Sequence, residues 1–333
     1  MIESETLLTV KDLKIRFNTE LGTITPVNGV SFTLRNGETT AIVGESGCGK
    51  SLTAMSIMGL IDKPGQIAAG NILFGGRDLT KLSQREWKKV RGKEIAMIFQ
   101  EPLTSLNPVY TVGDQISEAI RLHQKVSKAE AKQRSIELLK QAGIPRPEKV
   151  FDSYPHSLSG GMRQRAMIAI ALSCSPRLLI ADEPTTALDV TIQAQILELM
   201  RKLSREFKTA IMLITHDLGV VAEMADWVII MYAGQIVEQG NVFALFENPL
   251  HPYTVGLLGS TPKMNAEDTE ELEAIEGIVP SPYEKTDGCP FRPRCSRALP
   301  QCGRTAPEMV EISQNRSVRC LLYGGSKGGK RDE

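Results

Sequence analysis

The fold of this chain is decided by one stretch of its sequence, Gly44-Glu45-Ser46-Gly47-Cys48-Gly49-Lys50-Ser51. The stretch fits the pattern G-x-x-x-x-G-K-[ST], in which backbone N–H groups hold phosphates at the N-terminus of a helix. A short β run, Thr39–Val43, precedes the stretch, and a helix-like run, Leu52–Leu60, follows it, as the pattern requires. The sequence therefore predicts a P-loop that binds a nucleotide and Mg²⁺, with contacts from Gly44, Ser46, Gly47, Cys48, Gly49, Lys50, Ser51 and Leu52.

Two carboxylates follow a second apolar run, within the sequence RLLIADEP at Arg177–Pro184. A buried strand that ends in a carboxylate is what a Mg²⁺ site beside a P-loop needs. Because adjacent side chains on a strand point to opposite faces, we expect Asp182 and Glu183 to have different roles. We assign Asp182 to Mg²⁺, together with Ser51, and Glu183 to the attacking water as general base.

The order of apolar runs predicts the α/β class. Apolar positions alternate over Leu7–Phe17 and Val30–Leu34, which indicates antiparallel strands joined by turns. Polar segments with helical spacing fill residues of about 102–173 and predict a helical subdomain. Short apolar runs at Leu178–Ala181, Ala210–Thr215 and Val228–Met231, separated by helical segments, are typical of a mostly parallel sheet with crossovers.

Composition excludes several classes of protein. Lys and Arg equal Asp and Glu at 39 each among 333 residues, so no global basic field exists to hold nucleic acid. No apolar run approaches the about 18 residues that cross a bilayer. Residues 1–6 hold two acids and no apolar core of a secretory signal, so we expect a cytoplasmic protein with reduced thiols.

A further segment points to a family. The run Leu158-Ser159-Gly160-Gly161-Met162-Arg163-Gln164-Arg165 resembles the signature motif of ATP-binding cassette (ABC) ATPases. Ser159, Gly160 and Gly161 open a helix, so free N–H groups and the helix dipole can face an anion. In the family that anion is the γ-phosphate bound by the other subunit. The resemblance therefore implies a RecA-like P-loop core and a head-to-tail dimer that encloses two nucleotides.

Other residues resemble landmarks of the same family, in the family's order. Gln100 resembles the glutamine loop, which touches Mg²⁺ and relays the nucleotide state to partner subunits. The stretch Ala187-Leu188-Asp189 resembles the D-loop, which lies across the dimer. His216 resembles the switch histidine at the γ-phosphate, and Phe17 occupies the place of the aromatic that stacks on adenine, where many members carry Tyr.

The most specific resemblance is to the ATPase subunits of bacterial dipeptide and oligopeptide importers. It rests on QEPLTSLNP at residues 100–108, NPLHPYT at residues 248–254 and CPFRPRC at residues 289–295. Such systems combine two related ATPases, here implying a paralogous partner in a heterodimer, with two membrane permeases and an extracytoplasmic substrate-binding protein. The resemblance places the chain on the cytoplasmic face of the inner membrane, held by the permeases.

Two alternatives stay open at this point. Nickel and glutathione importers use close relatives, and an ATPase subunit does not itself contact the substrate. ABC ATPases of DNA repair or translation usually carry two cassettes or long coiled coils, whereas this chain has one P-loop and no sustained heptads.

The composition changes after the predicted nucleotide-binding domain, residues 1–262. Six acids between residues 266 and 276 predict an acidic linker over 263–284. A small cysteine-rich module is predicted over 285–323, followed by a disordered tail over 324–333.

The four cysteines of this module follow the spacing C-x5-C-x6-C-x17-C. Zinc ribbons set their cysteines in closer pairs. Four thiolates suit an iron–sulfur cluster, and members of the importer family have a similar region associated with a 4Fe–4S cluster. Zinc and unligated thiols remain alternatives. The predicted ligands are Cys289, Cys295, Cys302 and Cys320, with Arg292, Arg294, Arg297 and Arg319 to offset the charge.

Overall fold

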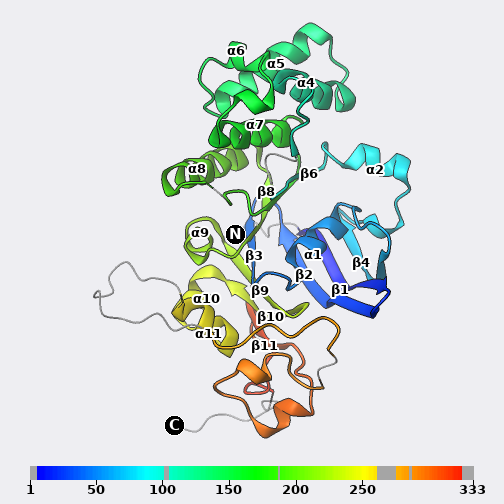
Figure 1. Ribbon diagram of the computed structural model, residues 1–333, viewed down its shortest axis with the longest axis vertical. Coiled ribbons are helices and arrows are strands. Elements are labelled where there is room, and N and C mark those ends of the chain that lie inside the picture. Colours follow the sequence, from blue (N-terminus) through cyan, green and yellow to red (C-terminus); the bar gives the residue numbers. More distant parts are fainter. Residues whose placement is uncertain (1–5, 101–104, 187, 261–274, 285–286, 325–333) are drawn as a thin grey trace.

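The computed structural model describes residues 6–100, 105–186, 188–260, 275–284 and 287–324, and within these ranges eight strands form one mixed sheet (Figure 1). Neighbouring parallel strands run in the order β9 (Trp227–Tyr232), β3 (Thr39–Val43), β8 (Ala210–Thr215), β7 (Leu178–Asp182) and β6 (Ile95–Ile98). Beyond β9 the sheet continues antiparallel through β10 (Gln235–Asn241), β12 (Arg316–Val318) and β11 (Val310–Ser313). Strand β3 thus lies inside the sheet, and the carboxyl ends of β6, β7, β8 and β3 meet at one edge.

A second sheet is antiparallel and has the order β2-β1-β4-β5. Its strands are β1 (Thr6–Thr19), β2 (Gly22–Arg35), β4 (Gly65–Phe74) and β5 (Arg77–Asp78). The strand predicted over Val30–Leu34 is longer in the structure, because β2 begins at Gly22 and runs through Pro26 and Gly29. Strand β2 is an edge strand, and a proline there removes no hydrogen bond between strands when its nitrogen faces outward.

The P-loop joins the two sheets through helix α1 (Lys50–Ile57), which begins two residues before the predicted helix and ends three residues earlier. Side chains from β1, β2 and β4 pack with α1 and one face of the mixed sheet in a common core, to which Ile15, Val27, Ile57 and Ile214 belong. The phosphate loop is therefore braced by buried residues on both sides. Helix α2 (Gln84–Val90) and the 3₁₀ turn η1 (Leu79–Lys81) follow the antiparallel sheet.

A group of helices lies at one end of the long axis of the molecule (Figure 1). Thr111, Ser127 and Ser159 cap three of them by accepting a hydrogen bond from a backbone N–H of the first turn. The helices occur within the range of 102–173 assigned to a helical subdomain, of which residues 102–104 lie outside the described residues. The elements are α4 (Val112–His123), α5 (Lys128–Gln141), α6 (Pro147–Phe151), η2 (Pro155–Ser157) and α7 (Gly160–Leu172).

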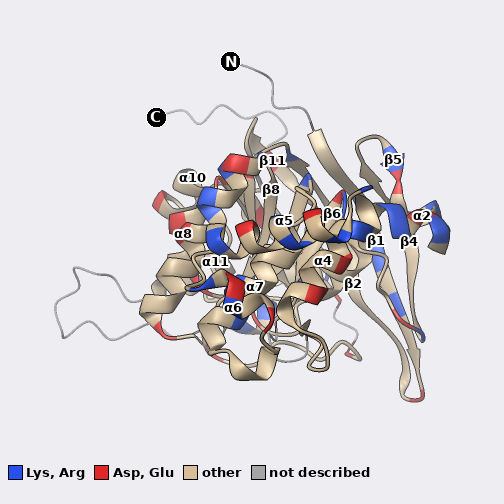
Figure 2. Ribbon diagram, turned by 90° about the horizontal axis from the view of Figure 1, so that it is seen from above, with Lys and Arg blue, Asp and Glu red and all other residues tan. Residues whose placement is uncertain are grey.

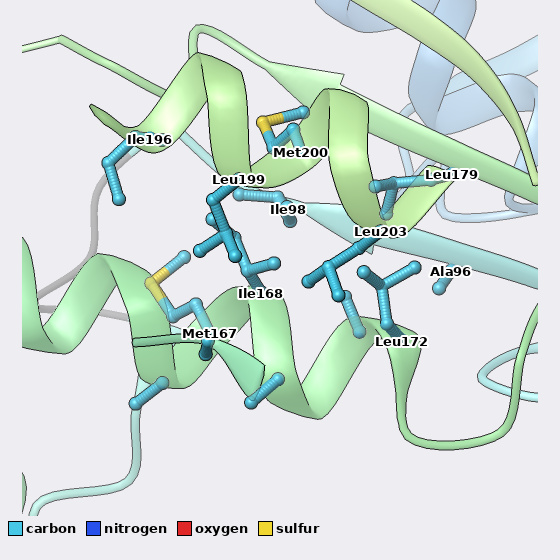
Figure 3. Close-up of a cluster of buried hydrophobic side chains, with 14 of the residues drawn as sticks. Ala96, Ile98, Met167, Ile168, Leu172, Leu179, Ile196, Leu199, Met200 and Leu203 are labelled. Carbon is cyan, nitrogen blue, oxygen red and sulfur yellow. The ribbon is translucent and has the colours of Figure 1, made fainter. Parts of the chain in front are cut away.

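Helices α7 and α8 (Val190–Phe207) pack over the sheet through apolar side chains (Figure 3). In α8 the buried positions Ile196, Leu199, Met200 and Leu203 recur at helical spacing and face Met167, Ile168 and Leu172 of α7. Ala96, Ile98 and Leu179 of the sheet complete this core. The packing fixes the start of α7, which holds the signature residues, relative to the strands.

The remaining helices are α9 (Leu218–Met224), α10 (Val242–Glu247) and α11 (Pro252–Gly259). The C-terminal segment, by which we mean residues 287–324, contains the 3₁₀ turns η3 (Arg292–Arg294) and η4 (Pro300–Gly303) as well as β11 and β12. It packs against β9 and the start of α11, because Phe291 contacts the rings of Tyr232, His251 and Tyr253. The six acids of the predicted linker, except Glu276, and the predicted tail after residue 324 lie outside the described residues.

The buried carboxylate of Glu238 joins three parts of the fold. It accepts hydrogen bonds from the backbone N–H of Leu250 at 3.0 Å and of His251 at 2.8 Å, and from Nη2 of Arg316 at 2.9 Å. Glu238 has no exposed surface.

None of the helices in the described ranges is long and apolar enough to span a membrane.

Candidate nucleotide-binding and hydrolysis site

The phosphate loop follows β3 so closely that its glycines are sterically required. A Cβ atom at Gly44 would lie 2.2 Å from the backbone oxygen of Met231. At Gly49, φ is +101° and a Cβ atom would lie 2.6 Å from the backbone oxygen of Pro26. The loop therefore presses against β9 and β2, and its backbone N–H groups are fixed at the start of α1, where an anion binds.

Lys50 closes the loop from inside. Its Nζ donates to the backbone oxygens of Gly44 at 2.7 Å and of Glu45 at 3.0 Å, and its residue is only 6% exposed. The Sγ of Cys48, which is fully buried, lies 3.8 Å from the same nitrogen. Burial raises the pKa of the Cys48 thiol, so it is a small neutral side chain that fills space under the loop, as the sequence suggested.

Asp182 is the last residue of β7 and is 4% exposed. Burial raises its pKa, and a hydrogen bond from Ser51 opposes that rise. Its Oδ1 is buried and has no hydrogen-bond partner among the described residues. A buried carboxylate oxygen beside the P-loop serine is the donor set that Mg²⁺ prefers, so these residues fit the predicted metal ion.

Glu183 follows Asp182 but does not continue the strand. Its φ of +46° turns the chain, and its N–H donates to the backbone oxygen of Ile214 at 2.9 Å. Asp182 and Glu183 therefore do not alternate between the two faces of one strand, because β7 ends at Asp182. The two carboxylates nevertheless have different surroundings, since Asp182 contacts Ser51 and Glu183 contacts the ends of other strands.

Three side chains hold the carboxylate of Glu183. Oε2 accepts hydrogen bonds from Nε2 of Gln100 and Oγ1 of Thr186, both at 2.9 Å, and Oε1 lies 3.2 Å from Nδ1 of His216. Burial alone would raise the pKa of Glu183, but the bonds from Thr186 and His216 outweigh burial and set it below its ordinary value. The carboxylate is thus ionised at neutral pH, as a base that accepts a proton from water must be.

The signature residues line a second pocket, apart from the phosphate loop. Ser159 caps α7 by accepting from the N–H of Met162 at 3.3 Å, and Asp189 caps α8 by accepting from Ile192 at 3.0 Å. A pocket of about 460 Å³ lies between these two helix starts. It contains no residue of the phosphate loop, all of which are described. The lining residues are Ser159, Gly160, Gly161, Met162, Arg165, Leu188, Asp189 and Ile192.

Comparisons with known proteins agree with this geometry. The family described as "ABC transporter" matches residues 27–186, and the family described as "Oligopeptide/dipeptide transporter, C-terminal region" matches residues 237–302. The chain is 54% identical over 319 residues to the oligopeptide transport ATP-binding protein AppD of Bacillus subtilis, covering 96% of this chain and 97% of that protein. The chain belongs to the ABC transporter family.

Other relatives of this ABC ATPase give the same result. It is 50% identical over 314 residues to the dipeptide transport ATP-binding protein DppD of Escherichia coli, which covers 94% of this chain and 96% of that protein. A solved dimer of the ATP-binding cassette MJ0796, bound to ADP and Pi in a post-hydrolysis state, has a TM-score of 0.64 and 27% identity. It covers 71% of this chain and 99% of that one. The chain is therefore an ATP hydrolase with the ABC-type P-loop fold.

The remaining predicted residues of the ABC ATPase have separate positions. Phe17 lies on β1, half-buried, and its ring packs against Gly65 of β4, where a Cβ atom would lie 2.6 Å from its Cε1. Leu52 lies on α1, partly buried, next to Ser51. Ala187 of the predicted D-loop lies outside the described residues. The adenine contact of Phe17 and the D-loop role of Asp189 stay predictions.

The four cysteines of the C-terminal segment lie within electrostatic reach of one another. Burial raises the pKa of the Cys289, Cys295 and Cys320 thiols, and neighbouring thiols of the set raise it further. The backbone N–H of Cys289 donates a hydrogen bond to the backbone oxygen of Cys302 at 2.8 Å. However, no three His, Cys, Asp or Glu side chains among the described residues are placed to hold a metal ion. Neither the family matches nor the structure supports a 4Fe–4S cluster.

One contact of the ABC ATPase escaped the sequence analysis. Arg294, predicted to offset the charge of a cluster, instead pairs with Glu45 of the phosphate loop at 2.6 and 2.9 Å. Thr186, which donates a hydrogen bond to Glu183, was also missed, although its place three residues after the predicted general base is a signal that could have found it. The pair of Arg294 and Glu45 spans 249 residues and leaves no local signal.

Proposed function

We propose that this chain is the ATP-hydrolysing subunit of an importer of dipeptides or oligopeptides. The observation that carries the proposal is the presence of both family matches on one chain, the ATPase and the oligopeptide/dipeptide transporter C-terminal region. Relatives that are 49–54% identical over nearly the whole chain are named as dipeptide or oligopeptide transport ATP-binding proteins, which supports the same substrate class.

We assign the chemistry of hydrolysis to residues at the carboxyl edge of the sheet. Lys50 leaves the oxygens of Gly44 and Glu45 to pair the β- and γ-phosphates. Glu183 takes a proton from the water whose oxygen attacks the γ-phosphorus, and the bond to the β,γ-bridging oxygen breaks to give ADP and phosphate. Ser51, Asp182 and Gln100 would hold Mg²⁺, which when bound would offset the negative charge of the phosphates. His216 contacts the γ-phosphate from the end of β8.

The separation of the signature pocket from the phosphate loop supports a composite site. Ser159, Gly160 and Gly161 open α7 with free N–H groups, and an anion at this place is stabilised by the helix dipole. We propose that the anion is the γ-phosphate on the loop of an opposing ATPase, with Asp189 near the same interface. The opposing subunit is a paralogue of this chain, and the two enclose two nucleotides.

We propose the partners from the same importer architecture. Two membrane permeases hold the ATPase pair at the cytoplasmic face of the inner membrane, and an extracytoplasmic binding protein delivers the peptide. Basic and acidic residues are interspersed over helices α4 to α8 in Figure 2. This distribution supports a protein partner. Proteins that bind DNA or RNA instead carry a concentrated basic patch.

A reconstituted complex tests the transport proposal. The chain, its paralogue and the two permeases are placed in liposomes, and ATP hydrolysis is measured with binding protein that carries a dipeptide, a longer peptide, glutathione or Ni²⁺. We expect only the peptides to stimulate hydrolysis. Stimulation by glutathione or Ni²⁺ alone would assign the chain to one of those importers, and stimulation by DNA without permeases would point to repair.

For the domains we propose an ATPase domain over 1–262, an acidic linker over 263–284, a cysteine-rich module over 285–323 and a C-terminal tail over 324–333, of which only residue 324 is among the described residues. We also propose that Cys289, Cys295, Cys302 and Cys320 hold a 4Fe–4S cluster. Four cysteines within one short segment of the chain are the donor set that such a cluster uses, and this composition is what motivates the proposal.

Anaerobic purification tests the cluster. We expect brown protein that absorbs near 400 nm with about four irons per chain, and Cys→Ser at any of the four positions should loosen the C-terminal segment without loss of ATP binding. Stoichiometric zinc without iron would exclude the cluster, and a metal-free, folded segment would exclude both metals.

A further inference from the structure

The C-terminal segment contacts the phosphate loop through one ion pair. Arg294, the last residue of η3, places Nη1 2.6 Å from Oε2 of Glu45 and Nη2 2.9 Å from Oε1. The pair is bidentate, and the side chain of Arg294 is 5% exposed while that of Glu45 is 28% exposed. Such a paired, largely buried geometry fixes both groups more firmly than a surface ion pair does.

The guanidinium of Arg294 also contacts groups outside the phosphate loop. Its Nε donates to the backbone oxygen of Glu276 at 3.0 Å, and Nη2 donates to that of Ile275 at 3.2 Å. Its central carbon lies 5.8 Å from the ring centroid of Tyr232. The segment preceding residue 277 and strand β9 therefore determine where the guanidinium points, and it points at the loop.

Glu45 connects this pair to the phosphate anchor. Its N–H donates to the hydroxyl of Tyr253 at 3.0 Å, and its backbone oxygen accepts from Nζ of Lys50 at 3.0 Å. One residue of the loop is thus held at its N–H by α11, at its carbonyl by the anchor lysine and at its carboxylate by the C-terminal segment.

A carboxylate on a loop that binds phosphates needs an explanation, because like charges repel. The bidentate contact both neutralises the carboxylate of Glu45 and keeps it turned toward the C-terminal segment. We propose that Arg294 is a positioning residue for nucleotide binding, which acts by holding the Glu45 carboxylate away from the triphosphate. The inference rests on ATP binding alone and not on the transported substrate.

The proposal predicts an asymmetry between the two partners. Arg294→Gln frees a negative charge beside the phosphates and should weaken MgATP binding by about tenfold. Glu45→Gln removes that charge and should bind MgATP at least as tightly as the wild type. The double variant E45Q/R294Q lacks the harmful carboxylate and should return to within about threefold of the wild type.

The experiment measures the Kd of a fluorescent ATP analogue with Mg²⁺ on the full chain, at low and high salt. Arg292→Gln is the matched control, because Arg292 lies on the same 3₁₀ turn and is exposed. The weakening in R294Q should shrink at high salt, as expected for charge repulsion. A Kd of R294Q within twofold of the control would overturn the proposal.

Two further outcomes decide the case where R294Q fails to fold. The variant E45Q leaves the C-terminal segment intact, and tenfold weaker MgATP binding in this variant would overturn the proposal. A folded double variant that binds MgATP about tenfold more weakly than the wild type would also overturn it, because the loss would then come from packing and not from the carboxylate.

Discussion

Oε1 of Glu183 lies 3.2 Å from Nδ1 of His216, and through this contact the end of β7 meets the end of β8. Gln100, just after β6, holds the other oxygen of the same carboxylate at 2.9 Å. The carboxylate that follows β7 therefore receives side chains from just after both neighbouring strands, β6 and β8. A group held by so many neighbours has a defined direction, which a general base needs to act on one water molecule.

Replacing Glu183 separates binding from chemistry. Glu183→Gln keeps the shape and the hydrogen bond from Thr186 but cannot accept a proton, so we expect ATP to bind normally and turnover to fall by about 10² to 10⁴-fold. Multiple-turnover phosphate release by the assembled complex measures the loss. Glu206→Gln, an exposed position on α8, is the control and should retain full activity. Fast turnover by the Glu183 variant would remove this residue from the role.

Replacing Lys50 gives the opposite defect. Lys50→Ala removes the buried ammonium that pairs with the phosphates, so we expect nucleotide affinity to fall by at least about tenfold. Equilibrium binding of a fluorescent ATP analogue checks this, with the exposed Lys202→Ala as control. Unchanged affinity in K50A would contradict the assignment of Lys50 as phosphate anchor.

The composite site predicts that the chain alone hydrolyses ATP slowly. Specific activity should rise with protein concentration or with the addition of the paralogue, because Ser159 acts on a nucleotide held by another subunit. If the chain self-associates, mixing Lys50→Ala with Ser159→Arg should recover activity, since one intact composite site forms in the mixed dimer. The control is K50A alone at the same total protein concentration. Full activity at concentrations where only monomer exists would exclude this arrangement.

His251 predicts a loss of stability in acid. Burial lowers its pKa to about 4, and its Nδ1 accepts the N–H of Tyr253 at 3.0 Å, which requires a neutral ring. The folded pKa lies below the unfolded value of about 6.5, so the unfolded chain binds the proton first and stability falls as pH drops from about 6.5 to about 4.

The expected size of this effect is about 2 kcal/mol between pH 7.5 and pH 5. The measurement is the free energy of unfolding in urea at both values for the wild type and for His251→Asn, which can cap α11 but does not titrate in this range. The wild type should lose about 2 kcal/mol more than the variant. Equal losses in the two proteins would show that His251 is accessible to protons in the folded state.

Local patterns in the sequence predicted the strand that leads into the phosphate loop. The strand before the loop was predicted with its observed bounds, Thr39–Val43, because a buried parallel strand is a continuous apolar run that the P-loop motif marks at its end. The start of β2, at Gly22 and not at Val30, was harder to predict, since Pro26 is acceptable only on an edge strand and edge position depends on the whole sheet. The turn at Glu183 likewise depends on tertiary contacts, here with Ile214.

The contact of Arg294 with Glu45 could not be predicted, because nothing in either local sequence refers to the other. The arginines near the cysteines suggested that they offset the charge of a metal centre. One of them, Arg294, instead pairs with the phosphate loop. The same holds for Phe291, whose three aromatic neighbours come from β9, the start of α11 and the residue before it.

The buried Glu238 has a consequence for how the chain is made. A protein grows from its N-terminus, and β10 is complete some 75 residues before Arg316 is added. Until then the carboxylate lacks its cation and β10 is an open edge, a surface that readily pairs with other chains. Strands β12 and β11 therefore cover the edge of the ATPase sheet, and we expect a chain that ends after residue 262 to aggregate.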